Sequence, residues 1–132
     1  MKAHELRIGN WVADRGGKQW IIDSWERHDK VSAEAPYLGE SEFGEITGHP
    51  LTEYVEYLQP IPLTEEWLIK FGFIKHPKFE EVFLIINKIG LYVDSSIRLA
   101  CDEYEIQIEH VHQLQNLYFA LTSEELTIKE TV

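Results

Sequence analysis

Two histidines separated by one residue, His110 and His112, have the type and spacing that come closest to a metal site. On a strand such residues share one face, and Asp102, Glu105 and Glu109 offer carboxylates nearby, a set that would suit a small metal-dependent hydrolase. On a helix the two imidazoles would point about 200° apart, and no HExxH or comparable spacing supports ligation. A capping or interfacial role is therefore favoured for both histidines, and no metal or other cofactor is predicted.

Other patterns that could do chemistry have structural explanations. No serine, cysteine or lysine nucleophile stands in a motif with a base. Gly16-Gly17 is followed by neither a helix nor a Lys-Ser/Thr pair, so it predicts a hairpin turn and not a phosphate loop. The adjacent carboxylates Glu65-Glu66 and Glu80-Glu81 face different ways in regular structure and indicate a solvated surface. The single cysteine, Cys101, lies in an apolar run and is expected in the core. The sequence thus predicts no catalytic residue and favours a protein that is not an enzyme.

The chain contains four tryptophans, which could line an aromatic groove for a peptide or a base: Trp11, Trp20, Trp25 and Trp67. Large aromatic side chains more commonly dominate protein cores. We expect the core role for this set.

Net charge is −11, from 12 basic and 23 acidic side chains, and the intervals 31–69 and 99–128 contain no Lys or Arg. Phosphate binding requires clustered basic residues, so direct binding of nucleic acids or of anionic membranes is not expected. A protein that displays carboxylates like phosphates could instead occupy a host DNA-binding protein's basic cleft, as an acidic nucleic-acid mimic. An acidic surface that only serves solubility is the preferred explanation.

Length and composition predict one folded domain over residues 1–132, with subregions 1–59, mostly β, and 60–132, α+β. Residues 1–5 contain no apolar h-region of a signal peptide, and no stretch approaches about 18 continuous apolar residues. The expected location is cytoplasmic, without a membrane association.

The first half of the chain reads as β structure. Residues 6–12 and 18–24 predict a hairpin with a bulge at Gly9-Asn10, and residues 25–35 a third strand that turns at 26–30. Residues 36–50 predict a loop or a short strand at 43–46, and alternation over 53–58 predicts a further strand. Together these elements favour a small SH3-like barrel or a curled antiparallel sheet.

The second half mixes helices and strands. The segment 60–62 is an extended linker, after which Thr64 predicts a helix N-cap and Gly72 a helix end, with Trp67, Leu68 and Phe71 on one face. Antiparallel strands are expected at 81–87, 90–94, 97–101 and 104–108, and an edge strand at 126–129. The expected fold class is therefore α+β, closed by one longer C-terminal helix.

That helix, over residues 111–121, is the clearest single element, because Val111, Leu114, Leu117, Tyr118 and Leu121 form one apolar stripe. The opposite face carries no charge, and four of its side chains are the candidate contact surface: His112, Gln115, Asn116 and Phe119. Exposed helix faces usually carry Lys and Glu. We therefore expect this face to be covered in part, with His112 and Phe119 at least half buried.

Three stretches resemble a family of small uncharacterised proteins from phage and prophage regions of Bacteroidetes-type gut bacteria. They are residues 6–12 (LRIGNWV), residues 60–73 (PIPLTEEWL with FGF), and residues 110–126 (HVHQLQNLYFALT with EEL). The resemblance implies a mobile-element context and carries over no catalytic or binding residue. Taken with the residues above, it leads us to expect a non-enzymatic interaction protein that contacts itself or a host or phage protein. The acidic mimic and the metal-dependent hydrolase are the alternatives.

Overall fold

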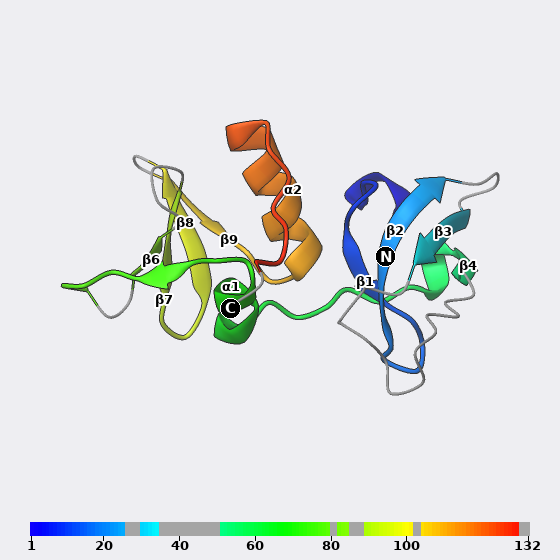
Figure 1. Ribbon diagram of the computed structural model, residues 1–132, viewed down its shortest axis with the longest axis horizontal. Helices are drawn as coiled ribbons and strands as arrows, with labels where there is room; N and C mark the ends of the chain where they lie inside the picture. Colours follow the sequence, from blue (N-terminus) through cyan, green and yellow to red (C-terminus); the bar gives the residue numbers. More distant parts are fainter. Residues whose placement is uncertain (26–29, 35–50, 80–81, 85–88, 102–103, 130–132) are drawn as a thin grey trace. The chain divides into compact units, whose positions relative to one another are not determined.

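The computed structural model describes residues 1–25, 30–34, 51–79, 82–84, 89–101 and 104–129. The chain forms two compact units, unit 1 (Met1–Ile61) and unit 2 (Pro62–Val132), and each contains its own antiparallel sheet (Figure 1). The predicted α+β class is confirmed. The single domain expected from chain length stays a prediction, so each unit is described by itself.

Unit 1 is a curled four-stranded sheet in the order β1-β2-β3-β4, as the sequence predicts. Its elements are η1 (Ala3–Glu5), β1 (Trp11–Ala13), β2 (Gln19–Trp25), β3 (Lys30–Glu34), β4 (Leu51–Tyr54) and the 3₁₀ helix η2 (Val55–Tyr57). After η2 the chain returns to β1, where the backbone groups of Ala13 and Gln59 exchange hydrogen bonds of 2.9 and 2.8 Å. This return curls the sheet towards a barrel around a core that includes Val12, Ile22 and Val31.

Two boundaries in unit 1 differ from the sequence-based expectation. The strand predicted over 53–58 ends at Tyr54, because Val55 and Leu58 are both buried and their spacing of three residues suits a 3₁₀ turn. The strand predicted from Leu6 begins only at Trp11, after a turn in which Gly9 has φ of 96°. The predicted loop at 36–50 and the strand at 43–46 lie outside the described residues.

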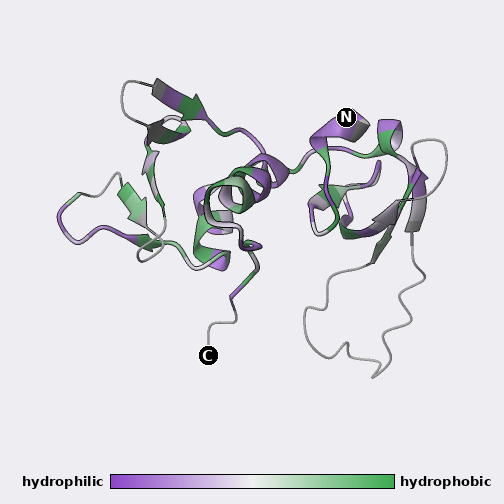
Figure 2. Ribbon diagram, turned by 90° about the horizontal axis from the view of Figure 1, so that it is seen from above, coloured by the Kyte–Doolittle hydropathy of each residue, from purple (hydrophilic) through white to green (hydrophobic). Residues whose placement is uncertain are grey.

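Unit 2 contains a five-stranded meander in the order β5-β6-β7-β8-β9. Its elements are α1 (Glu65–Lys70), β5 (Ile74–Lys75), β6 (Val82–Leu84), β7 (Gly90–Val93), β8 (Ile97–Cys101), β9 (Tyr104–Gln107) and α2 (Val111–Thr122). The strand register places Phe83 opposite Leu91 and Leu99 opposite Ile106 on one face of the sheet. This face is apolar and is buried except at Ile106 on the edge strand, whereas the other face carries Tyr92 opposite Arg98 and is more exposed. Hydrophobic residues, green in Figure 2, occur along the strands and helices of both units.

Helix α1 begins and ends where the sequence predicts. The Thr64 hydroxyl accepts a hydrogen bond from the Trp67 amide at the N-cap. At the other end, the amides of Gly72 and Phe73 donate to the carbonyls of Ile69 and Leu68, which is a Schellman motif. Gly72 has φ of 93°, a left-handed conformation that favours glycine. This six-residue helix is held by the burial of Trp67, Leu68 and Phe71.

The edge strand predicted at 126–129 is wrong. Leu126 is buried, and the Lys129 amide donates a 2.8 Å hydrogen bond to the Lys70 carbonyl at the end of α1. The segment therefore binds a helix end and not a sheet edge. Among the helices in the described residues, none is both long enough and apolar enough to cross a membrane.

Candidate functional site

Unit 1 carries a continuous series of aromatic and cationic side chains at its surface, here called the aromatic–cation face: Arg15, Tyr57, Tyr54 and the half-buried Lys30. The Arg15 guanidinium carbon lies 4.1 Å from the centre of the Tyr57 ring, and the Lys30 Nζ lies 4.5 Å from the centre of the Tyr54 ring. The two tyrosine rings meet edge to face at 6.1 Å. Both tyrosines are 39% exposed, so the rings present apolar surface to solvent between two cations.

Four separate elements position this face. Lys30 and Tyr54 are direct cross-strand neighbours on β3 and β4, and Tyr57 follows in η2. Arg15 comes from the β1–β2 turn, which Asp14 organises by accepting hydrogen bonds from the amides of Gly16 and Lys18. The hydrogen bond from the Trp20 indole, 3.0 Å long, is the main cause that lowers the pKa of Asp14 below its ordinary value. The turn is therefore fixed to the sheet by an ionised carboxylate.

The tryptophans contribute little to this surface. Trp11, Trp20 and Trp67 are buried, as the core interpretation predicts, and only Trp25 is exposed. Tyrosines supply the exposed rings instead. No sequence periodicity reveals the aromatic–cation face. Tyr57 lies in a turn of 3₁₀ helix, and Arg15 is distant from both tyrosines along the chain.

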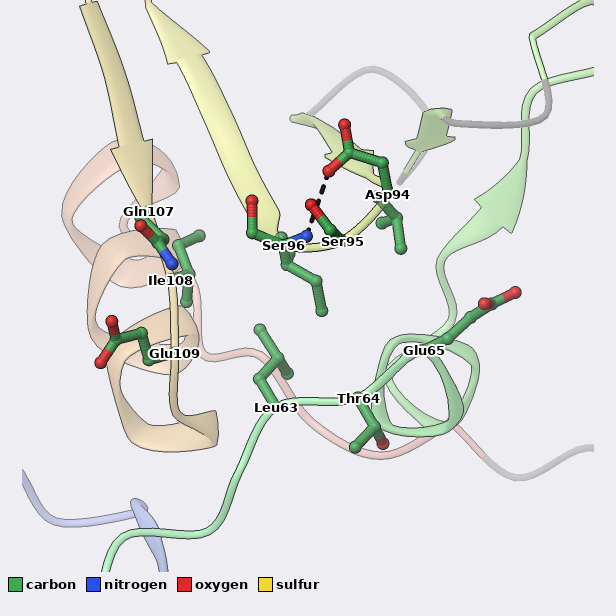
Figure 3. A pocket seen from close by; sticks show the side chains of 11 residues that line it. Leu63, Thr64, Glu65, Asp94, Ser95, Ser96, Gln107, Ile108 and Glu109 are labelled. Atoms are coloured by element: carbon green, nitrogen blue, oxygen red, sulfur yellow. Dashed lines mark hydrogen bonds between the residues drawn. The ribbon is translucent and has the colours of Figure 1, made fainter.

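Unit 2 contains a pocket of about 370 Å³ between three segments: Leu63–Glu65, Val93–Ile97 and Gln107–Glu109 (Figure 3). Its lining includes the carboxylates of Glu65, Asp94 and Glu109 and no Lys or Arg. The pocket thus combines hydroxyl, amide and carboxylate groups with the apolar side chains of Ile97 and Ile108.

A network of charges on the exposed sheet face adjoins this pocket. Arg98 on β8 contacts Asp94 at 2.7 Å and Glu105 at 3.0 Å. The Ser96 amide donates a hydrogen bond to the Asp94 carboxylate, and this is the main cause that lowers the pKa of Asp94, with Arg98 adding to it. Lys75 lies 3.4 Å from Glu65. The region holds more acidic than basic groups, since Glu109 adds a further carboxylate.

The predicted contact residues of α2 are placed unevenly. His112 and Gln115 are buried, at 2% and 1% exposed, whereas Asn116 is half-buried and Phe119 is 40% exposed. The burial expected for both side chains is confirmed for His112, whereas Phe119 is among the exposed hydrophobic residues. The buried face of α2 includes Val111, Leu114 and Tyr118 but not Leu121, so it is turned towards His112 and Gln115 relative to the predicted stripe. A contact role for the four side chains stays a prediction.

The histidine pair does not form a metal centre with its described neighbours. His110 is the N-cap of α2, and its ring stacks on that of His112 with centroids 5.8 Å apart. Of the proposed carboxylates, Glu105 pairs with Arg98 and Asp102 lies outside the described residues. Within the described ranges, no group of three or more His, Cys, Asp or Glu side chains could hold a metal ion.

The helix start depends on Gln113, whose Oε1 accepts hydrogen bonds from the amides of Glu109 and His110, at 2.9 and 3.1 Å. This is the glutamine half of a capping box, three residues after the N-cap. The spacing of His110 and Gln113 is visible in the sequence and could have located the helix start more directly than the histidines.

The sequence and the fold were compared with known proteins. No family model, curated protein or solved structure matches this chain.

Proposed function

We propose that this chain is a non-enzymatic interaction protein that acts through protein contacts, and that the aromatic–cation face of unit 1 provides one contact. The observation that carries the proposal is the unbroken series of contacts from Arg15 through Tyr57 and Tyr54, all exposed, to the half-buried Lys30. Tyrosine and arginine are enriched at protein interfaces, where an amphipathic ring buries apolar area and keeps its hydroxyl hydrated.

The geometry favours a partner that carries an apolar or aromatic side chain next to a carboxylate. The first would cover the tyrosine rings, and the second would pair with Arg15 or Lys30. Cations held over rings are already positioned, so binding immobilises fewer side chains than it would on a mobile surface. Edge-to-face rings and cation–π contacts each contribute about 0.5–1 kcal/mol at exposed sites, enough to preorganise the face and too little to explain the fold.

The wider context of the proposal is a phage or an integrated element, and it is supported by the resemblance of residues 6–12, 60–73 and 110–126 alone. The alternative of an acidic mimic requires one continuous acidic surface, and some of its carboxylates, at 40–45 and 102–103, lie outside the described residues. The hydrolase alternative lacks a described ligand set. We therefore favour binding to another protein as the function.

An affinity capture from host lysate, with and without induction of the element, tests this proposal. The bait is the full chain, compared with a Tyr54→Ser/Tyr57→Ser double variant. Tyr92→Ser in unit 2 is the matched control, because Tyr92 is also an exposed strand-region tyrosine, at 44%. We expect a protein that the wild type and the control retain and the double variant loses.

Phe119→Glu belongs in the same experiment, because it tests the contact predicted on α2. A partner that depends on Phe119 and not on Tyr54 and Tyr57 would move the contact to unit 2. Equal capture by all four proteins, or by none, would contradict the proposed role of the aromatic–cation face.

A further inference from the structure

Strand β9 has an open edge in unit 2. It is the last strand of the sheet, and its partner β8 pairs with Ile106 through Leu99 and with Gln107 through Arg98. The Ile108 amide donates to the Ile97 carbonyl at 2.9 Å, so these two facing residues form a hydrogen-bonded pair of the ladder. Pairs alternate in an antiparallel ladder, so the backbone N–H and C=O groups of Glu105 and Gln107 point away from β8. In the described part of the chain, no strand pairs with them.

Just after β9, at Glu109 and His110, the same edge already binds an extended segment of its own chain. The Leu63 amide donates to the Glu109 carbonyl at 2.9 Å, and Pro62 and His110 form an antiparallel bridge. The chain then leaves the edge at Thr64, which is the N-cap of α1. The line of a sixth strand is therefore occupied beside Glu109 and open beside Gln107 and Glu105.

The pocket of unit 2 lies where this line becomes open, since it is bounded by Leu63–Glu65 on one side and by Gln107–Glu109 on the other (Figure 3). A strand that extended the sheet would place one side chain in it. Next to Gln107 on the other face of β9, Ile106 is 43% exposed although its direct partner Leu99 is buried. An added strand would also cover this apolar side chain.

Charge decides between two occupants of the edge. Glu65, Asp94, Glu105 and Glu109 lie at the pocket or on β9, against the two cations Lys75 and Arg98. A second copy of the chain would bring the same excess of carboxylates to an antiparallel pairing, and like charges across strands are destabilising. A basic segment would be attracted by them.

We propose that the β9 edge of unit 2 binds an extended, basic segment of a partner protein by strand addition. The partner's backbone pairs with the N–H and C=O groups of Glu105 and Gln107. One Lys or Arg side chain enters the pocket among Glu65, Asp94 and Glu109, and an alternate apolar side chain covers Ile106. This surface lies wholly in unit 2 and does not require the aromatic–cation face, so either proposal can fail while the other holds.

The probe is a short acetylated peptide that alternates lysine and valine, titrated into the full chain at low ionic strength. Two matched peptides are its controls: one with glutamate in place of lysine, and one N-methylated at alternate residues, which removes half of the backbone donors. Affinity comes from the titration, and amide hydrogen exchange at Glu105 and Gln107 reports where the peptide lies. We expect binding of the lysine peptide alone, with both amides protected by it.

Gln107→Pro removes the outward N–H that the added strand needs, at an edge position where proline is tolerated. It should weaken the lysine peptide by at least about tenfold, a loss of about 1.4 kcal/mol, whereas Gln107→Ala should bind like the wild type. If the proline variant fails to fold, Glu65→Lys/Glu109→Lys provides the second test, because it should weaken the lysine peptide and admit the glutamate peptide.

Three results would overturn the proposal. The first is equal binding of the N-methylated peptide, which would mean that no backbone pairing occurs. The second is binding that leaves the Glu105 and Gln107 amides unprotected. The third is self-association of the unliganded chain, seen by light scattering and abolished by Gln107→Pro, which would assign the edge to a second copy.

Discussion

In unit 1 two exposed tyrosines carry cations over their rings, whereas in unit 2 carboxylates surround a pocket beside an open strand edge. Both surfaces lie on antiparallel sheets of a chain whose net charge is −11. The negative net charge therefore agrees with the acidic pocket of unit 2 but does not predict the two cations of the aromatic–cation face. Specific partners recognise such local surfaces, whereas net charge mainly governs solubility and encounter rates.

The largest expected effects come from the cores of the two units. Phe71 in unit 2 and Ile22 in unit 1 are both fully buried. Phe71→Ala should cost about 3–5 kcal/mol of unfolding free energy and Ile22→Ala about 2–5 kcal/mol, because each leaves a cavity. Denaturant unfolding followed by amide exchange in β2 and β8 measures both. We expect each variant to lower protection mostly in its own unit; equal loss in both would establish the single cooperative domain predicted from chain length.

The next effect compares a glycine in each unit. Gly72 has φ of 93°, and a Cβ there would lie 2.8 Å from the Cγ of Lys129. Gly72→Ala should therefore cost about 1–2 kcal/mol, mostly from the left-handed backbone, since the lysine chain can move. Gly16 is the control, because its φ is not positive and an added Cβ would meet Asp14 Oδ1 at 3.4 Å. Thermal unfolding of both variants checks this order, which equal destabilisation would contradict.

Acid titration compares one carboxylate in each unit, Asp14 and Asp94, whose pKa values are both lowered from 3.8. A lowered folded-state pKa contributes stability that is complete above the unfolded value and is lost as pH falls through the folded value. The advantage of the wild type over Asp14→Asn should thus be constant near neutrality and shrink below about pH 3.8. Asp94→Asn should follow the same pattern in unit 2. An advantage that grew on acidification would contradict the assigned sign.

The smallest expected effect concerns the ion pair of Arg98 and Glu105 on the exposed face of unit 2. The Glu105 side chain is 58% exposed, so Glu105→Gln should change stability by less than about 1 kcal/mol. The same variant should weaken the lysine peptide modestly, because it removes one carboxylate from the edge. Chemical denaturation at low and high salt measures the first effect. A loss above this range that salt did not reduce would show a structural role for the pair.

Local signals located several elements correctly. Thr64 and Gly72 delimit α1 because capping depends on a few adjacent residues, and the alternation along β2, β7 and β8 follows from the period of two in a half-buried sheet. The strand predicted over 126–129 fails for the opposite reason. Its backbone pairs with the end of α1, a partner that lies far away along the chain and that no local pattern reveals.

The candidate surfaces were less predictable than the elements that carry them. The amphipathic period identified α2, but its polar residues His112 and Gln115 are buried while Leu121 is exposed. Periodicity measures which residues share a face and not what covers that face. Likewise, the core role expected for four tryptophans is met by three and not by Trp25, which is exposed, and the sequence did not single out the tyrosines whose rings meet the cations.

By itself, the sequence of this protein determined the α+β class, the curled first sheet, the ends of α1 and the position of α2, since hydrophobic period, caps and turns act over a few residues. Only the tertiary structure brought Arg15, Tyr57, Tyr54 and Lys30 together and left the β9 edge open beside a pocket. Those arrangements depend on strand register and on chain returns between distant segments. Register is fixed by the packing of the whole sheet, which no short stretch of sequence contains.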